Sequence, residues 1–187
     1  MEHLGFTSVD ERLAERFHMD LDLLRTLNLD ANFRPGETIS VAAPGEPVEG
    51  KVARIEADRK AKQVRAFSSD GKLISVYPAT IGSEENPSPS GTHEVKGVAP
   101  MPVYTYRPDV NFQQGDNDEV LQIPGGPNNP VGTIWIDLSE PTYGIHGTPE
   151  PAQIDKVSSH GCVRLTNWDA EELGAMVDPG VTVEFVN

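Results

Sequence analysis

The chain has 187 residues, of which 15 are Lys or Arg and 29 are Asp or Glu, so its formal net charge is −14. Such a chain lacks the clustered basic side chains that bind phosphate backbones and anionic lipids, which argues against nucleic acid and membrane surfaces as partners. It also has no apolar run of about 18 residues that could form a transmembrane segment, and its first residues lack the order of a signal peptide. We therefore expect that any export signal has been removed.

The composition is that of one folded domain with many turns. The chain is 37% hydrophobic and contains 17 glycines and 16 prolines, which predicts short strands rather than a helical bundle or a disordered chain. Its length fits one domain with a small appendage. Cys162 is the single cysteine, which excludes an intramolecular disulfide and a cysteine-rich zinc cluster.

Residues 1–45 are predicted to form a small, helix-rich cap. Ser8, with a Glu three residues later, fits a capping box at the start of one helix, and Asp20 can cap a second. Asn28 suits a left-handed exit from the second helix, and a Pro-Gly turn in residues 33–41 is expected to lead into a short strand. A unit of this size buries little apolar surface, so we expect it to pack on the remainder or to be part of a larger module.

After a Pro- and Gly-rich linker at residues 42–50, the pattern changes to strands separated by turn residues. One strong helix is predicted from Trp168 to Val177, with Asn167 as its N-cap. Residues 51–187 therefore form a mainly β domain with one C-terminal helix, and its first three strands are expected to pair as consecutive antiparallel hairpins. The predicted strands are 51–57, 63–67, 72–81, 93–98, 120–123, 132–138, 143–146 and 181–186.

Cys162 is the candidate nucleophile of this domain. An ordinary thiol has a pKa of about 8.5 and reacts well at neutral pH only when an imidazole or a positive environment favours its thiolate. His146 precedes the cysteine by sixteen residues and His160 by two. We favour His146 as the base because it arrives from another strand, and nucleophile and base usually meet in the fold rather than in sequence. Gly161 would let backbone amides approach a developing oxyanion closely.

Other interpretations of these residues stay open on spacing alone. Cys162 and the two histidines could bind a metal, but they would need a fourth ligand, and a free cysteine is most often a buried core residue. Arg164 could bind a substrate carboxylate or be a solvated strand charge. Tyr104 and Trp135 could line a substrate cleft, although aromatic side chains in β domains more often pack in the core or across strands.

A longer pattern resembles a known family. Ile145-His146-Gly147, followed by Ser158-Ser159-His160-Gly161-Cys162-Val163-Arg164-Leu165, is similar to the signature of the L,D-transpeptidase catalytic domain, often called YkuD-type. Residues 87–92 (PSPSGT) and 129–136 (NPVGTIWI) also resemble this family, and the match runs from about Lys51 to Val186. Residues 13–41 resemble, more weakly, the later part of a LysM-like module, which is a peptidoglycan-binding unit.

This resemblance implies a mixed β-sheet, sandwich- or barrel-like enzyme that acts on peptidoglycan stem peptides without a cofactor or metal. Cys162 would attack the third residue of a tetrapeptide stem, expel the terminal D-Ala and hold the acyl group as a thioester. The side-chain amine of a second stem would then accept it, forming a 3→3 cross-link. The implied setting is cell-wall biosynthesis and cell shape in the periplasm or cell wall of a bacterium, where carbapenems would acylate Cys162.

The resemblance also implies roles for individual residues. His146 corresponds to the general base, and Gly147 to the position whose carbonyl holds the imidazole. The turn from Ser158 to Cys162, with Ser159 and Gly161 in it, would surround the oxyanion site, and His160 would support that turn or bind substrate.

Two alternatives to this function are kept. The thioester could be hydrolysed, which would make the protein a carboxypeptidase or endopeptidase. The fold could instead be inactive, and the cap would then bind the wall through its glycan.

Overall fold

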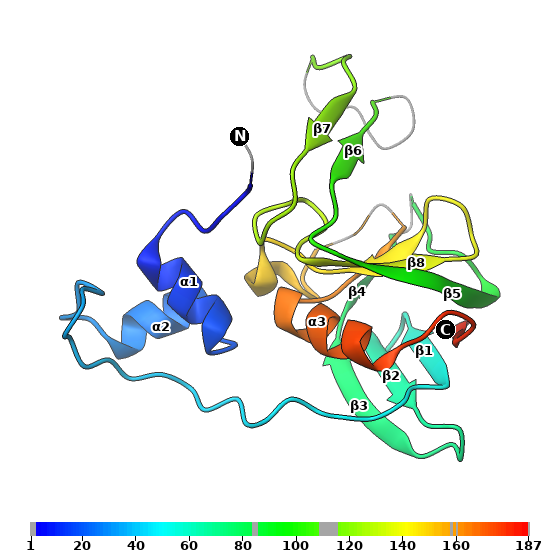
Figure 1. Ribbon diagram of the computed structural model, residues 1–187, viewed down its shortest axis with the longest axis horizontal. Helices are drawn as coiled ribbons and strands as arrows, with labels where there is room; N and C mark the ends of the chain where they lie inside the picture. The colour runs from blue at the N-terminus through cyan, green and yellow to red at the C-terminus, as the bar shows by residue number, and fades with distance from the viewer. Residues whose placement is uncertain (1–2, 84–85, 109–115, 158, 160, 187) are drawn as a thin grey trace. The chain divides into compact units, whose positions relative to one another are not determined.

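The computed structural model describes residues 3–83, 86–108, 116–157, 159 and 161–186. The chain divides into two compact units, a smaller one of Gly5–Pro47 and a larger one that combines Met1–Leu4 with Val48–Asn187. Figure 1 labels many of the helices and strands described below. Within the described part of the chain, none of the helices has the length and apolar character that crossing a bilayer requires.

The smaller unit contains the two predicted helices, α1 (Val9–Arg16) and α2 (Leu21–Leu27). The capping box is confirmed, because the Ser8 hydroxyl accepts the Glu11 N–H at 3.2 Å and the Glu11 carboxylate accepts the Ser8 N–H at 3.3 Å. The Asp20 cap is confirmed as well, with its carboxylate accepting the Leu23 N–H at 2.9 Å. A small core of Ala14, Met19 and Leu24, with neighbouring apolar side chains packed on it, joins the two helices.

The strand predicted within residues 33–41 is wrong, since that segment has no strand in the structure. The reason is that neither helix offers a strand to pair with it. The Asn28 side chain takes the place of such a neighbour: its amide donates to the Ser40 carbonyl at 2.8 Å and accepts the Ser40 N–H at 2.6 Å. Asn28 itself has φ −135°, so the left-handed exit predicted for it is also wrong.

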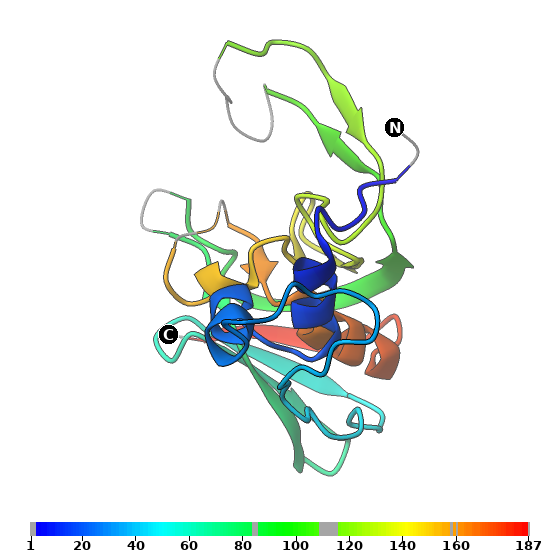
Figure 2. The ribbon, with the colours of Figure 1, turned by 90° about the vertical axis from the view of Figure 1, so that its left-hand side faces the viewer.

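The larger unit is mainly β, as predicted. A mixed sheet in the order β3-β2-β1-β11-β5-β8-β9-β10-β4 curls in a barrel-like way (Figure 1, Figure 2). The first three strands form consecutive antiparallel pairs, whereas β1 with β11 and β9 with β10 run parallel. The strands of this sheet are β1 (Arg54–Asp58), β2 (Gln63–Phe67), β3 (Leu73–Pro78), β4 (Thr80–Ile81), β5 (Gly91–Pro100), β8 (Ile134–Leu138), β9 (Gly144–His146), β10 (Val163–Arg164) and β11 (Thr182–Val186).

Helix α3 (Asn167–Met176) packs against β8 and β9 and covers part of the main core. That core includes side chains with no exposed surface, among them Ile55, Ile136, Ile145 and Leu173. The prediction that Asn167 caps this helix is wrong by one residue. Thr166 is the N-cap, with its hydroxyl accepting the Asp169 N–H at 3.2 Å, and Asn167 lies in the first turn with its side chain turned inward.

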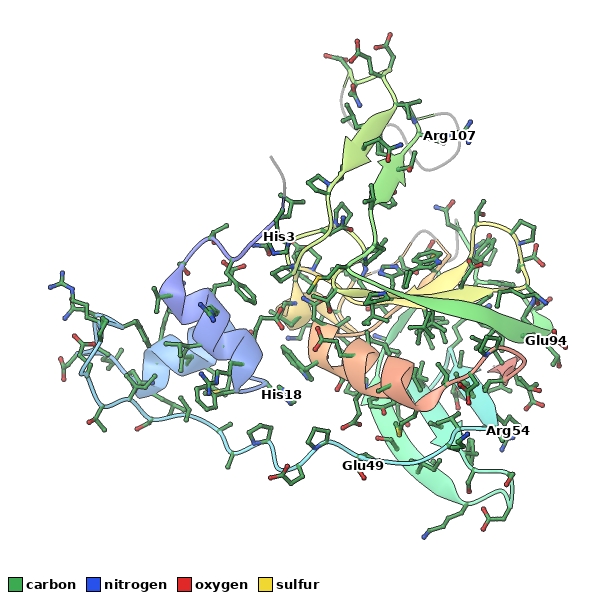
Figure 3. The ribbon with its side chains drawn as sticks, viewed as in Figure 1. His3, His18, Glu49, Arg54, Glu94 and Arg107 are labelled. Atoms are coloured by element: carbon green, nitrogen blue, oxygen red, sulfur yellow. The ribbon has the colours of Figure 1, made fainter. Side chains whose placement is uncertain are left out.

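Two further elements connect these strands. The short strands β6 (Tyr104–Tyr106) and β7 (Leu121–Ile123) form a two-stranded antiparallel ribbon that projects from the curled sheet, as Figure 2 shows in green. A 3-10 turn, η1 (Pro151–Gln153), lies between β9 and β10. Figure 3 shows Arg107 just beyond β6 on this ribbon, whereas Arg54 lies at the start of β1.

Candidate active site

The candidate nucleophile lies immediately before β10, at the junction of three short strands. Val163 of β10 pairs with Ile145 of the parallel strand β9 and with Ile81 of the antiparallel strand β4. Continuing this register back by one residue places Cys162 beside Gly144. Its side chain is partly exposed, and the thiol donates to the carbonyl of Thr142 across 3.7 Å.

Arg164 links His146 to this thiol. His146 is in register with Trp135 of β8 on one side and with Arg164 of β10 on the other. The charge of Arg164 acts on both the imidazole of His146 and the thiol of Cys162. Both groups therefore lie near the guanidinium of Arg164.

The hydrogen bond of the imidazole defines its protonation state. His146 Nδ1 lies 2.6 Å from the carbonyl oxygen of Gly147. A carbonyl only accepts, so Nδ1 carries the proton and Nε2 of the neutral ring keeps its lone pair. The ring is 5.6 Å from the indole of Trp135 between centroids, with the planes at 19°. The imidazole of β9 is thus held on two sides: the Trp135 indole of β8 stacks on its face, and the carbonyl of Gly147, the residue after β9, bonds to its Nδ1.

Burial keeps this imidazole neutral. His146 is 5% exposed, and desolvation lowers its pKa to about 4. The bond to the Gly147 carbonyl acts in the opposite direction, and the nearby charge of Arg164 lowers the pKa further. At neutral pH the ring is consequently uncharged, and its Nε2 carries a lone pair that can accept a proton.

The thiol is also neutral at rest. Burial raises the pKa of Cys162, while the Gly144 N–H directed at the sulfur and the positive charge of Arg164 oppose that rise. Burial thus disfavours the charged form of both groups, because it raises the pKa of Cys162 and lowers that of His146. Attack by sulfur requires that its proton be transferred as the new bond forms.

Two serine hydroxyls form hydrogen bonds that hold the turn before Cys162. Ser159 is 3% exposed, and its hydroxyl accepts the Gly82 N–H at 2.8 Å and donates to the Cys162 carbonyl at 2.6 Å. Ser88 is 5% exposed and donates to the Gly161 carbonyl at 2.6 Å. Sequence reasoning noted the segment that contains Ser88 but gave this residue no role.

Glycine is required at position 161. Its φ is +106°, a conformation that side chains rarely adopt, and an added Cβ would lie 2.6 Å from Cε1 of Tyr143. Ser158 and His160, which were predicted to belong to the same turn, lie outside the described residues.

Arg164 lies beside the candidate base and nucleophile. Its guanidinium is partly buried, and its Nε is a buried donor without a partner in the part of the chain that the structure describes. Burial lowers the pKa of this group, and the charges of Glu150 and Cys162 oppose the shift. A buried cation with an unused donor is suited to a carboxylate.

The predicted aromatic residues have different surroundings. The Trp135 indole stacks on His146 as described, and its Nε1 donates to Asp137 at 3.1 Å. Tyr104 lies on β6, where burial raises its pKa and the charges of Cys162 and Tyr106 add to the shift. Tyr104 is therefore close enough to Cys162 to feel its charge.

Asn167 packs against Gly147, the residue whose carbonyl bonds to the imidazole, and sequence reasoning did not foresee this contact. Its side chain accepts the Thr133 N–H at 3.1 Å and donates to the Pro127 carbonyl at 3.2 Å. An added Cβ on Gly147 would lie 2.3 Å from Asn167 Oδ1, and one on Gly132 would lie 2.0 Å from the same atom. The NPVGT segment thus packs directly against Gly147, a relationship for which its sequence provided no signal beyond the family resemblance.

No group of three or more His, Cys, Asp or Glu side chains that could hold a metal ion occurs among the residues for which positions are described.

Comparison with known proteins supports one family. The family model for the L,D-transpeptidase catalytic domain, YkuD, matches residues 53–185. A protein of Bacillus subtilis named "Putative L,D-transpeptidase YkuD" is 29% identical over 156 residues, covering 83% of this chain and 79% of its own. A protein of the same name from Bacillus licheniformis is 32% identical over 132 residues, covering 71% of this chain and 64% of its own.

Solved structures share the fold. An L,D-transpeptidase from Mycobacterium smegmatis matches with a TM-score of 0.58 and 21% identity, over 81% of this chain and 64% of its own. L,D-transpeptidase 3 from Mycobacterium tuberculosis, in complex with a faropenem-derived adduct, matches with a TM-score of 0.59 and 19% identity, over 74% of this chain and 61% of its own. The chain thus spans less than two thirds of these two structures and of the B. licheniformis relative. Since the family model covers most of the chain, this protein belongs to the L,D-transpeptidase catalytic domain (YkuD) family.

Proposed function

We propose that this protein is a peptidoglycan L,D-transpeptidase that uses Cys162 as its nucleophile and His146 as its general base. The observation that carries the proposal is the bond from His146 Nδ1 to the Gly147 carbonyl. It leaves Nε2 with the lone pair, and the charge of Arg164, which acts on both this imidazole and the Cys162 thiol, supports their proximity. Membership in the family supports the substrate class of the proposal, and the pairing of Cys162 with His146 supports its chemistry.

The first half-reaction forms a thioester. Cys162 Sγ attacks the carbonyl of the third residue of a tetrapeptide stem, and the thiol proton moves to His146 Nε2. Backbone amides of the turn before β10 stabilise the negative oxygen of the tetrahedral intermediate. The bond to the terminal D-Ala then breaks, and its amine leaves with the proton from the imidazolium.

The second half-reaction transfers the acyl group. The side-chain amine of a diamino acid in another stem attacks the thioester, and His146 accepts the proton that the amine loses. Collapse of the intermediate breaks the C–S bond, forms the 3→3 cross-link and returns the proton to sulfur. No oxidant, metal or cofactor enters this balance.

Arg164 and Tyr104 are proposed to bind substrate in this scheme. The Nε of Arg164, which has no hydrogen-bond partner among the described residues, is suited to a carboxylate of the donor stem, because charge-assisted hydrogen bonds to guanidinium are stronger than neutral ones. Tyr104 is close enough to the sulfur for the two charges to interact, so it is placed to contact the stem beside the reacting carbonyl. Acting on peptidoglycan would place the protein in the periplasm or cell wall of a bacterium.

The test is to incubate purified tetrapeptide stems with the protein and to identify the products by mass spectrometry. Dimers with release of one D-Ala support transfer, whereas tripeptide monomers alone show that water is the acceptor and contradict it. Cys162→Ala is expected to abolish both products. Imipenem should add its mass to the wild type and not to this variant, and an adduct that persists in Cys162→Ala would contradict the nucleophile assignment.

We further propose that the LysM-like cap predicted at residues 1–45, which contains most of the smaller unit, contacts the glycan. A depression in the smaller unit supports the idea, and it is lined by Leu27, Asn28, Leu29, Asp30, Ala31, Glu37, Thr38 and Ser40. Retention on insoluble peptidoglycan should fall when residues 1–45 are removed. Equal retention of the full and shortened chains would show that the cap does not contribute to peptidoglycan binding.

A further inference from the structure

The peptide bond between Gly161 and Cys162 is held from one side by a buried hydroxyl. Ser88 Oγ donates to the Gly161 carbonyl at 2.6 Å, and Ser88 is 5% exposed. The Gly161 carbonyl therefore points into the protein. Since the described chain contains no cis peptide bonds, the Cys162 N–H of the same peptide group points the opposite way.

This orientation matters because of where Cys162 lies. Its side chain is partly exposed, so a substrate can reach the sulfur, and the Cys162 N–H is turned away from the buried Ser88 hydroxyl. The backbone N–H of a nucleophilic residue is a donor that acyl-transfer enzymes use to stabilise the oxyanion. With the carbonyl turned inward, the Cys162 N–H is available for that task.

The neighbouring glycine makes this orientation easy to lose. Gly161 has φ +106° and lacks the side chain that would restrict its ψ, so rotation of the peptide plane is cheap unless another group holds it. The Ser88 hydroxyl is such a group. It complements Ser159, which holds the next carbonyl, that of Cys162, at 2.6 Å.

Ser88 is itself fixed by its surroundings. Arg59 Nη2 donates to the Ser88 carbonyl at 3.2 Å. Gly82 packs so closely that an added Cβ would lie 2.5 Å from the Ser88 nitrogen and 2.8 Å from its Oγ. The hydroxyl therefore has a defined position from which to hold the Gly161 carbonyl.

We infer that Ser88 is a positioning residue for acyl transfer, which keeps the Cys162 N–H directed at the oxyanion through its bond to the Gly161 carbonyl. This inference rests on the proposed function of Cys162. It assigns Ser88 no contact with substrate and no role in forming the thiolate.

Two reactions of the Cys162 sulfur distinguish an effect on the oxyanion from an effect on the reactivity of the sulfur itself. Acylation by imipenem passes through a tetrahedral oxyanion: sulfur bonds to the lactam carbonyl carbon, the C–N bond breaks, and the nitrogen takes a proton. Alkylation by iodoacetamide displaces iodide and forms no oxyanion. A lost oxyanion donor should therefore slow the first reaction and leave the second unchanged.

The test measures both rates for Ser88→Ala by the mass of the Cys162 adduct. Removing one oxyanion donor outright costs about 10²–10³-fold, and here the donor remains but is free to turn, so we expect acylation to fall about 10- to 100-fold. Alkylation should stay within about twofold of the wild type. Ser90→Ala is the matched control, since this exposed serine lies two residues away in the same segment, and both of its rates should equal those of the wild type.

Ser88→Thr provides a second measurement because it keeps a hydroxyl donor. Its ratio of acylation to alkylation should lie within about threefold of the wild type. Equal losses of both rates in Ser88→Ala, an unchanged acylation rate in that variant, or the same fall of the ratio in Ser88→Thr would each overturn the inference. Failure of the proposed function is distinguishable, because it would appear as imipenem acylation or stem turnover that persists in Cys162→Ala.

Discussion

The imidazole of His146 lies almost parallel to the indole of Trp135, with ring centroids 5.6 Å apart and an angle of 19° between the planes. The two residues are in register on β9 and β8. The indole thus covers one face of the base and contributes to the burial that lowers the pKa of His146 to about 4.

Trp135→Leu should raise the pKa of His146 and slow the enzyme. Loss of the indole exposes the ring to water, which favours its charged form, and removes a surface that holds its orientation. We expect a pKa closer to the ordinary value of about 6.5 and a fall in stem turnover of about tenfold. NMR titration of the imidazole measures the first effect. Trp135→Phe retains an aromatic ring, so its His146 pKa and its stem turnover should lie between those of the wild type and Trp135→Leu. An unchanged His146 pKa in Trp135→Leu would contradict this role of the indole.

His146→Gln should separate the acylation of Cys162 from its alkylation. The thiol bonds to the Thr142 carbonyl, and burial raises its pKa, so the imidazole does not hold a thiolate at rest. We expect acylation by imipenem to fall about 10²–10⁴-fold, because the general base is lost, while alkylation by iodoacetamide changes by less than threefold. The pH profile of acylation should change shape in the variant, since the two groups titrate as a pair. Parallel losses of both rates would indicate a preformed ion pair instead.

Two groups should give the stability of the protein opposite dependences on pH. The pKa of His146 is lowered to about 4 in the folded protein. Between about pH 6.5 and 4 its imidazole is therefore protonated in the unfolded chain but stays neutral in the folded protein. Stability from this group is present above pH 6.5 and is lost as the pH falls. Burial raises the pKa of Asp169 to about 6, well above the ordinary value of an aspartate, so the contribution of this group to stability is present at low pH and is lost as the pH rises to about 6.

Single variants should reveal each of these opposing slopes. Between pH 4 and 6, His146→Gln should make the free energy of unfolding fall more steeply as the pH rises, and Asp169→Asn should make it climb more steeply. Urea unfolding at several pH values measures both slopes. The pH dependence expected from His146 alone is about 3 kcal/mol over its full window. Identical slopes in the wild type and both variants would contradict the assignment.

Gly132→Ala should strongly destabilise the larger unit. The new Cβ would lie 2.0 Å from Asn167 Oδ1 and 2.6 Å from the Gly147 carbonyl carbon, and φ at this position is +63°. A clash with backbone and strain at a positive φ together should cost about 2–4 kcal/mol. Gly97→Ala is the control, because its Cβ would meet nothing within 4 Å, and we expect a change below about 1 kcal/mol. Equal urea midpoints for the two variants would show that the packing around Gly147 is not tight.

Arg164→Gln should weaken substrate binding more than it slows the chemical step. The variant loses the cation beside the candidate base and nucleophile, whose Nε is unpaired within the described part of the chain, so a stem carboxylate loses a charge-assisted hydrogen bond. We expect KM for the donor stem to rise about tenfold, and Arg164→Lys to restore only part of the loss because it lacks the planar fork. Lys96→Gln, which changes an exposed cation on β5, should leave KM unchanged. A donor stem without that carboxylate should bind wild type and Arg164→Gln equally.

The local elements of this protein follow from short-range sequence patterns. The Ser8 capping box, the Asp20 cap and the mainly β character of the larger unit depend on neighbouring residues, and the structure confirms them. The segment at residues 33–41 shows the limit of such reasoning. A strand requires a partner, and a side-chain amide, that of Asn28, takes the partner's place.

The sequence by itself determined the family and the candidate residues for its chemistry, because the motif around His146 and Cys162 resembles that of the L,D-transpeptidase catalytic domain, whose family model matches residues 53–185. Only the tertiary structure decided how these residues are held. The neutral state of the imidazole comes from burial by β8, and the inward turn of the Gly161 carbonyl comes from Ser88, which lies 73 residues earlier in the chain. Desolvation and long-range hydrogen bonds depend on which segments meet in space, and no local pattern of residue types encodes that.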